Sequence, residues 1–398
     1  MVRNACFTSE SVTEGHPDKI CDQIADAVLD EILTYEPDAH VACEVSAANG
    51  IVLVMGETSA LKKPDYGEIV RKVIEGIGYG QPESGFDLSH CATMVVMNSQ
   101  SPDIRMGVDS SREYQMGNAE ALDLAGAGDQ GMMVGFACDE TPELMPLPIS
   151  LAHKLTQRLA KVRKNGCLPW LLPDGKSQVT VRYDKAGEPL CCATIVVSAQ
   201  HRADVPGEEL ERAVRREVIE AVIPPEMFTD QTKIWINPTG RFVLGGPAAD
   251  SGLTGRKIMV DTYGGYVSHG GGAFSGKDPS KVDRTGAYMA RYIAKNIVAS
   301  GLARHCMIQL AYAIGVAQPV SVYLDTDGTG ILPDEVLSVI VRTCFDMRPA
   351  AMIEKFGLKQ PVYSQVSCYG HFGRGELNLP WEQTDMAFLL SAFRGIRY

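Results

Sequence analysis

Apolar and polar positions along the first quarter of the chain predict a helix followed by two strands, a second helix and a third strand. The first helix is amphipathic and runs from Pro17 to Leu33. Two strands within Val41 to Thr58 turn at Asn49-Gly50, a pair typical of tight hairpins. A helix from Asp65 to Ile77 and a strand from Ala92 to Met97 complete this unit.

The same order of elements returns twice. The second copy consists of a helix at Ile149–Lys164, a hairpin at Gln178–Ala199 turning at Ala186-Gly187, a helix at Glu208–Ile223 and a strand at Ile234. The third consists of a helix at Ser280–Ala299, strands at Met307–Leu324, a helix at Asp334–Met347 and an extended stretch at Gln360–Ser367. The long helices begin about 130 residues apart, which indicates three copies of one helix plus ββαβ unit. We therefore predict an α+β fold of three similar domains.

Two segments between these units lack apolar periodicity. Residues Ser99 to Asn118 are rich in Ser, Asp, Arg, Met and Gly, and a long loop of this kind in a compact protein is often a lid. Residues Asp261 to Ser280 are rich in glycine, so their backbone can approach a ligand closely. The alternative for both segments is a disordered surface connector.

The net charge of the chain narrows the classes of partner. The 398 residues carry a formal charge of −12, which repels phosphate backbones and argues against nucleic acid binding. Lysines concentrated beside glycines in such an acidic chain suggest a site for a small polyanion. The sequence has no apolar run of membrane-spanning length and no signal-peptide pattern at its start, so we expect no membrane partner and a cytoplasmic location.

The start of the first helix carries candidate chemistry. His16, Asp18 and Lys19 stand at its N-terminus, where Pro17 suits the first turn. A helix N-terminus attracts anions, so His16 could donate a hydrogen bond to a phosphate oxygen or to a leaving-group oxygen. Asp18 could bind Mg²⁺. The alternative is an ordinary helix start.

A glycine-rich turn at Gly126 to Gly131 precedes an apolar run. Its single carboxylate, Asp129, could be presented to ribose hydroxyls or to an adenine edge. A tight hairpin turn without a ligand explains the same residues.

The segment from Gly271 to Lys277 matches the first seven positions of the Walker A pattern, but Asp278 stands where Ser or Thr should hold Mg²⁺. We therefore exclude a P-loop nucleotidase. A flexible glycine loop remains, followed by cationic side chains at helical spacing and by a possible metal ligand: Lys277, Lys281, Arg284 and Asp283. A solvated, charged helix start is the alternative.

Further basic residues occur beside glycines, at Lys176, Arg241, Arg256 and Lys257. A turn glycine can expose a neighbouring basic side chain, but such pairs are common. Taken one at a time, these residues carry little information.

Together these segments closely resemble the methionine adenosyltransferase (S-adenosylmethionine synthetase) family. The strongest motifs are GAGDQG at Gly126–Gly131 and GGGAFSGKDPSKVDR at Gly270–Arg284. The supporting segments are SVTEGHPDKICDQIADA near the start, NSQSPDI at Asn98–Ile104, NPTGRFVLGGPAADSGLTGRKI at Asn237–Ile258 and YAIGVAQPVS at Tyr312–Ser321. The match is collinear from Phe7 to near the C-terminus. It departs from the family pattern at Thr285-Gly286 and at Arg105-Met106, which leaves lid behaviour less constrained.

The resemblance implies a role for each matching residue. Catalysis around the polyphosphate would fall to His16, Lys176, Arg256, Lys257, Lys277 and Lys281. ATP would also contact Asp129, Asp174, Arg241, Phe242, Asp250 and Ala273, and methionine would contact Glu57, Gln100, Asp250 and Lys281. Two Mg²⁺ ions per site would be held by Asp18 and Asp283, and K⁺ by Glu44.

The resemblance also implies the architecture and the reaction. It implies pseudo-threefold symmetry, with domains that we place at residues 1–102, 124–243 and 244–398 and a lid loop at 99–118. The expected reaction joins ATP and L-methionine and hydrolyses the released tripolyphosphate, in a homodimer with shared active sites that pairs into a dimer of dimers. Two other functions fit the same fold: a metal-dependent polyphosphate hydrolase and an inactive regulatory subunit.

Overall fold

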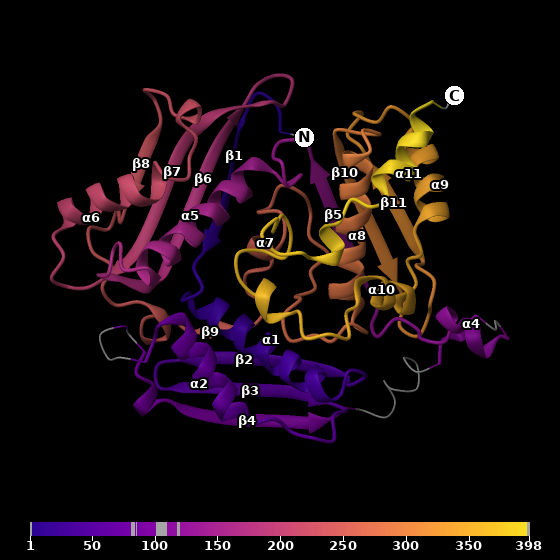
Figure 1. The fold of residues 1–398 in the computed structure, drawn as a ribbon, viewed down its shortest axis with the longest axis horizontal. Helices are drawn as coiled ribbons and strands as arrows, with labels where there is room; N and C mark the ends of the chain where they lie inside the picture. Colours follow the sequence, from indigo (N-terminus) through magenta and orange to yellow (C-terminus); the bar gives the residue numbers. More distant parts are fainter. Residues whose placement is uncertain (1, 81–83, 85, 101–109, 118–119, 396–398) are drawn as a thin grey trace.

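The fold consists of three α+β lobes, each built around a sheet and one long helix (Figure 1). The computed structural model describes residues 2–80, 84, 86–100, 110–117 and 120–395. Within these ranges the strands form three sheets, which confirms the predicted fold class of three similar units. No helix in the same ranges is both long and apolar enough to cross a membrane.

The sheets differ in strand number but share one plan. The first has the order β4-β3-β2-β9, with β2 (Val41–Ala48), β3 (Ile51–Thr58), β4 (Ala92–Ser99) and β9 (Gly252–Leu253). The second has the order β1-β6-β7-β8, with β1 (Cys6–Val12), β6 (Leu171–Tyr183), β7 (Pro189–His201) and β8 (Lys233–Ile236). The third has the order β11-β10-β5, with β5 (Gly131–Cys138), β10 (His305–Tyr312) and β11 (Ser321–Asp325).

The predicted helices are all present, with shifted ends. The long ones, which pack on the three sheets in turn, are α1 (Pro17–Tyr35), α5 (Leu147–Lys164) and α8 (Val282–Ala299). The other predicted helices are α2 (Tyr66–Ile77), α6 (Gly207–Val214) and α9 (Asp334–Cys344). Four short helices were not predicted: α4 (Arg112–Gln115), α7 (Ile258–Asp261), α10 (Pro349–Phe356) and α11 (Ala387–Ser391). The second unit's predicted helix ends early as α6 and continues in a π-helical turn, η4 (Arg215–Ile219).

The strand that precedes each long helix pairs in the sheet of a different lobe. β1 pairs with β6 of the second sheet, β5 pairs with β10 of the third, and β9 pairs with β2 of the first. The three lobes are therefore linked in a cycle, which accounts for the pseudo-threefold relation. The sequence pattern alone did not predict this exchange.

The predicted extended stretch at Gln360–Ser367 is wrong. The segment is irregular and contains a 3₁₀ turn, η7 (Ser364–Val366), instead of an extended stretch. The reason is that Asp30 of α1 accepts hydrogen bonds from the N–H groups of Tyr363 (3.0 Å) and Ser364 (2.8 Å). The Tyr363 ring also lies 4.2 Å from the Arg284 guanidinium. The hydrogen bonds to Asp30 hold the segment against α1, and the Arg284 contact holds it against α8.

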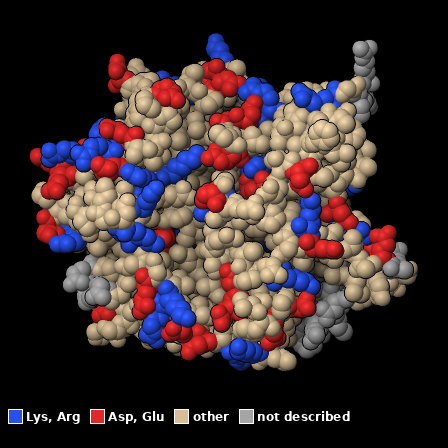
Figure 2. Space-filling view, viewed as in Figure 1, with Lys and Arg blue, Asp and Glu red and all other residues tan. Residues whose placement is uncertain are grey.

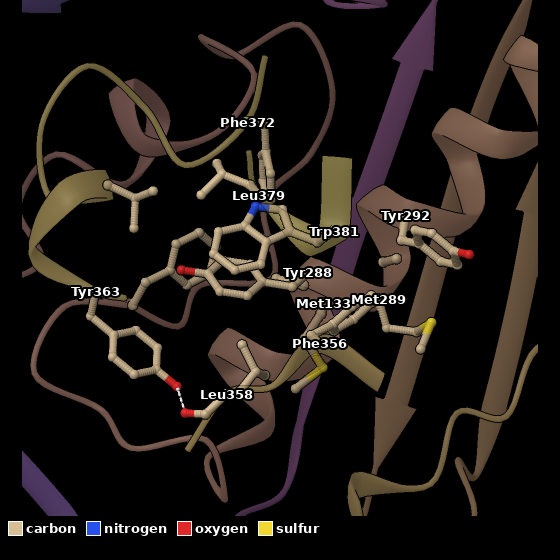
Figure 3. Close-up of a cluster of buried hydrophobic side chains, with 14 of the residues drawn as sticks. Met133, Tyr288, Met289, Tyr292, Phe356, Leu358, Tyr363, Phe372, Leu379 and Trp381 are labelled. Carbon is tan, nitrogen blue, oxygen red and sulfur yellow. Dashed lines mark hydrogen bonds between the residues drawn. The ribbon is translucent and has the colours of Figure 1, made fainter. Parts of the chain in front are cut away.

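Aromatic side chains fill the core between α8 and the C-terminal segments (Figure 3). The Tyr288 ring stacks on Trp381 with centroids 4.0 Å apart, and both side chains are fully buried. Tyr363 donates a hydrogen bond to the carbonyl of Leu358. This core fixes the start of α8, where candidate site residues lie.

The proposed lid falls partly outside the described residues, since 101–109 and 118 are not among them. Residues 110–117 contain α4, whose Glu113 carboxylate accepts hydrogen bonds from the N–H groups of Ala317 (3.0 Å) and Gln318 (3.0 Å). The N–H of Arg112 donates to Gly315. This half of the predicted lid is therefore attached to the connection between β10 and β11.

Candidate active site

His16 caps the N-terminus of α1. Its Nδ1 accepts a hydrogen bond from the Asp18 N–H (3.2 Å), so the neutral ring carries its proton on Nε2 and can donate there. Burial lowers the pKa of His16 to about 3, and the charges of Lys257 and Lys176 act in the same direction. His16 is therefore a neutral hydrogen-bond donor rather than a cation at neutral pH.

Cationic side chains surround Asp18 at the same helix end. Lys257 donates to Asp18 Oδ2 (2.6 Å), the Leu253 N–H donates to Oδ1 (3.0 Å), and Arg256 lies 3.7 Å from Oδ1. Burial raises the pKa of Asp18, but the hydrogen bonds from Lys257 and Leu253 outweigh burial and lower it overall. We call His16, Asp18, Lys176, Arg256 and Lys257 the helix-mouth cluster.

Lys176 joins this cluster through pairing between β1 and β6. The Thr13 N–H, just after β1, donates to the Gly175 carbonyl (2.9 Å), and Val12 is in register with Lys176. The Lys176 side chain is exposed. The structure thus brings together three segments that lie far apart in the sequence.

Asp174 lies beside the cluster with one oxygen free. Its Oδ2 accepts from the Gly246 N–H (2.9 Å), whereas its buried Oδ1 has no hydrogen-bond partner in the described part of the chain. Burial raises the pKa of Asp174 to about 6. A buried acceptor without a partner costs stability, so this oxygen suits a ligand donor such as a ribose hydroxyl.

Three other residues expected around ATP, Asp250, Phe242 and Arg241, lie on segments near Asp174. The Asp250 N–H donates to the Gly246 carbonyl (3.2 Å), and its side chain is exposed. Phe242 pairs with His201 through its backbone, and the exposed Arg241 precedes it. Sequence reasoning missed Gln200, which accepts from the Asp174 N–H (3.2 Å) and donates to the Val243 carbonyl (3.1 Å).

A second group of charges lies in the glycine loop before α8. Lys277 donates to Asp283 Oδ2 (2.7 Å), and Lys281 donates to Asp278 Oδ2 (2.5 Å). Lys277, Lys281 and Asp283 are partly exposed, whereas Asp278 is buried. We call these four residues the glycine-loop cluster.

Two charged residues of this segment are structural. Asp278, which takes the Walker Ser/Thr position, accepts from the N–H groups of Val41 (2.7 Å) and Ser280 (2.9 Å), which agrees with excluding a P-loop. The sequence pattern groups Arg284 with the cationic candidates, but Arg284 is fully buried and binds both oxygens of Asp26, at 2.7 and 2.9 Å. Arg284 is therefore unavailable to a ligand.

Gly276 cannot carry a side chain without displacing β2. Its φ is +79°, and a Cβ would lie 1.9 Å from the Cys43 carbonyl oxygen. We expect Gly276→Ala to lower the free energy of unfolding by about 3 kcal/mol, through the unfavourable φ and the overlap together. Denaturant unfolding would measure this loss. Gly271→Ala is the matched control, because Gly271 also has a positive φ (+98°) but no atom of the described residues within 4 Å of a Cβ. Equal losses in both variants would contradict the steric argument.

The remaining ATP candidates lie at the edges of these clusters. The Gly128 N–H donates to the Ser280 carbonyl (3.0 Å), which places the exposed Asp129 beside the glycine-loop cluster. Ala273 lies against Gly255, where a Cβ would be 2.5 Å from the Ala273 Cβ. Ala273 therefore stands between the two clusters.

The candidate methionine and K⁺ residues lie on or beside the face of the first sheet that α1 does not cover. Ala42 is in register with both Glu57 of β3 and Lys277 of the glycine loop. Glu44, two residues further along β2, is exposed on the same face. Gln100 follows β4, and its buried Oε1 has no hydrogen-bond partner among the described residues.

The two clusters lie at opposite ends of one strand. Ala42 of β2 pairs with Lys277, and Ala47 pairs with Gly252, next to the Leu253 that binds Asp18. Five residues of a strand span about 17 Å. Within one chain, therefore, Lys257 and Lys277 contact different carboxylates at separate places.

No single group of described residues forms a ready metal cage. Within the described ranges, no set of three or more His, Cys, Asp or Glu side chains converges on one point. Asp18 and Asp283 instead stand apart, each neutralised by one lysine. Lone carboxylates suit Mg²⁺, which binds proteins through one or two carboxylates and takes other oxygens from phosphate and water.

The structure thus combines three cyclically linked α+β lobes with cationic side chains on or beside glycine-rich turns. Three protein-family models match the chain. Models described as the N-terminal, central and C-terminal domains of S-adenosylmethionine synthetase match residues 4–102, 124–242 and 244–383. The chain therefore belongs to the S-adenosylmethionine synthetase family.

Proposed function

We propose that the protein is a methionine adenosyltransferase that makes S-adenosylmethionine from ATP and L-methionine and hydrolyses the tripolyphosphate to pyrophosphate and phosphate. Family membership supports this general activity. The observation that carries the proposal is the convergence of His16, Lys176, Arg256 and Lys257 on one helix N-terminus, a site suited to a polyphosphate.

The chemistry of the transfer requires charges and alignment more than a base. A thioether sulfur has no proton to lose, so a general base cannot assist its attack on C5′. Catalysis then depends on aligning sulfur, C5′ and O5′ and on stabilising the charge that builds on the departing polyphosphate. We assign the Nε2–H of His16 to the leaving oxygen, and the lysines with Arg256 to the phosphates.

In this proposal, separate sets of residues bind adenosine and methionine. Asp174, whose Oδ1 has no partner in the described ranges, accepts a ribose hydroxyl, and Asp129, Arg241, Phe242 and Ala273 complete the nucleoside pocket. Glu57, Gln100, Asp250 and Lys281 bind methionine. The Oε1 of Gln100, which has no hydrogen-bond partner among the described residues, suits the ammonium group of an amino acid.

In this proposal the Mg²⁺ and K⁺ ions are held by carboxylates described above. Asp18 and Asp283 would hold Mg²⁺, which neutralises polyphosphate charge when bound, and their lysine partners would remain to contact phosphate oxygens. Glu44 would hold K⁺ on the face of the first sheet. The domain boundaries 1–102, 124–243 and 244–398 and the cytoplasmic location stay predictions.

A dimer with shared sites is part of this proposal. Lys257 and Lys277 are assigned to one polyphosphate but lie at opposite ends of β2 in one chain. A two-fold axis through the face of the first sheet would place the helix-mouth cluster of each chain beside the glycine-loop cluster of its partner. The dimer would then have two such sites. Each of the two sites would then be complete.

The faces of two sheets support the same dimer. Met94, Val96 and Leu253 are 51%, 51% and 38% exposed on or at the edge of the first sheet, and Met132 and Tyr323 are about half exposed on the third. Exposed apolar residues on uncovered sheet faces favour burial against another protein surface. On the face of the molecule shown in Figure 2, acidic and basic side chains are interspersed. A further pairing of dimers into a tetramer is the wider proposal.

One assay tests the function. The protein is incubated with ATP, L-methionine, Mg²⁺ and K⁺, and mass spectrometry detects the sulfonium product. Phosphate release from ATP without methionine-dependent sulfonium would favour the polyphosphate hydrolase. Absence of both products would favour an inactive regulatory subunit.

The K⁺ site gives a separate prediction. We expect Glu44→Gln to raise the K⁺ concentration needed for half-maximal activity by about tenfold, because a charged oxygen ligand becomes neutral. Titration of activity with KCl at constant ionic strength would measure it. Glu10→Gln, a change at an exposed strand residue of another lobe, is the control. Unchanged K⁺ dependence in Glu44→Gln would remove Glu44 from the site.

A further inference from the structure

Four aspartates follow one face of α1 at intervals of four residues, and each accepts hydrogen bonds from the backbone of another segment. A spacing of four places side chains above one another on a helix. The acceptor and donor pairs are Asp18 with Leu253 (3.0 Å), Asp22 with Gly255 (2.9 Å), Asp26 with Gly276 (2.8 Å), and Asp30 with Tyr363 (3.0 Å) and Ser364 (2.8 Å). In Figure 1, α1 lies between the first sheet and the loops of the other lobes.

Asp22 is held in place by buried partners. Its Oδ1 accepts from the Gly255 N–H, and its Oδ2 accepts from Lys19 Nζ (2.9 Å). Lys19 also donates to Asp261 and to the Ser367 carbonyl (3.0 Å). Asp22 and Lys19 are both fully buried, so neither is free to contact a ligand. The residue that Asp22 fixes, Gly255, directly precedes Arg256 and Lys257.

Asp26 fixes the backbone of the second cationic loop, the glycine loop that carries Lys277. Its Oδ1 accepts from the Gly276 N–H, and Arg284 binds both of its oxygens. Gly276 directly precedes Lys277. The two fully buried aspartates therefore fix the backbone one residue before each of the loops that carry the cations.

We propose that Asp22 and Asp26 are positioning residues that set the two cationic loops against α1. The proposal rests on the proposed function, since it assigns these loops to the polyphosphate. Like charges in each loop repel one another, and glycine-rich backbone offers little resistance to that repulsion. Fixed acceptors on one rigid helix keep Lys257 and Lys277 at constant places, which a preorganised anion site requires.

Asp30 offers a matched control on the same helix. Asp30 accepts hydrogen bonds from the backbone N–H groups of Tyr363 and Ser364, just as Asp22 accepts one from Gly255. The segment that contains Tyr363 and Ser364, however, is not one of the two cationic loops. Asp22→Ala and Asp30→Ala should both lower the unfolding temperature. Only Asp22→Ala should weaken the polyphosphate site.

The test measures tripolyphosphate binding by calorimetry, without methionine, together with kcat and KM for ATP. We expect Asp22→Ala to raise the tripolyphosphate Kd at least tenfold and Asp30→Ala to leave it within about twofold. A wild-type Kd in folded Asp22→Ala, or an equal rise in Asp30→Ala, would overturn the positioning role. If the wild-type protein binds neither ATP nor tripolyphosphate, the proposed function itself fails.

The asparagine pair Asp22→Asn and Asp30→Asn repeats the comparison if the alanine variant does not fold. Gly255 and Lys19 donate to different oxygens of Asp22, and asparagine replaces one of these oxygens by an N–H₂ group that cannot accept. We expect the same direction with a smaller rise in Kd. Equal Kd values in the two asparagine variants would count against the proposal.

Discussion

Mixed dimers of His16→Ala and Lys277→Ala subunits are expected to regain activity that neither variant has alone. His16 lies in the helix-mouth cluster and Lys277 in the glycine-loop cluster, at opposite ends of β2 in one chain. If each site takes one cluster from each chain, a mixed dimer has one doubly damaged site and one intact site. Random pairing of equal amounts makes half of the dimers mixed, so about a quarter of the wild-type activity should return.

The control pairs two lesions from the same cluster. His16→Ala with Lys257→Ala should recover nothing, because each site in that mixed dimer keeps one lesion. The variants are co-expressed with different tags, since subunits joined by a large apolar interface exchange slowly. Recovery from the second pair, or none from the first although mixed dimers form, would show that each chain holds a complete site.

Elements with local patterns could be predicted from the sequence, but their partners could not. The periodicity of α1 and α5 and the hairpin of β6 and β7 depend on neighbouring residues. These elements are present at the predicted places with shifted ends, and β6 begins at Leu171 instead of Gln178. The pairing of β1 with β6 joins Cys6 to Arg182, which no local pattern contains. The irregular segment near Tyr363 likewise follows from contacts with Asp30, more than 300 residues away.

The same limit applies to the candidate site. Its motifs identified the segments, because unusual runs of glycine and charge are visible without a structure. They did not separate Lys277, which is partly exposed, from Arg284, which is buried against Asp26. The repeat of aspartates along α1 was visible in the sequence as a spacing of four. The role of this repeat depends on the positions of Gly255 and Gly276, which only the structure gives.

His16→Ala is expected to lower the kcat of adenosyl transfer by about 10²-fold or more while the protein stays folded. The variant loses the Nε2–H donor that we assign to the leaving oxygen, and it also loses the cap on the Asp18 N–H, which is worth about 1 kcal/mol. His16→Ser separates these effects, because serine caps a helix well but is too short to reach the same oxygen.

We therefore expect His16→Ser to recover the stability lost in His16→Ala but not its activity. Hydrolysis of added tripolyphosphate gives a second readout, since that reaction forms no bond at C5′ and should fall much less than adenosyl transfer. An equal fall in both reactions would place His16 on the phosphates instead of the leaving oxygen. A folded His16→Ala protein with nearly normal transfer would remove His16 from the reaction, because a neutral donor in a water-poor site cannot be lost without slowing the step that it stabilises.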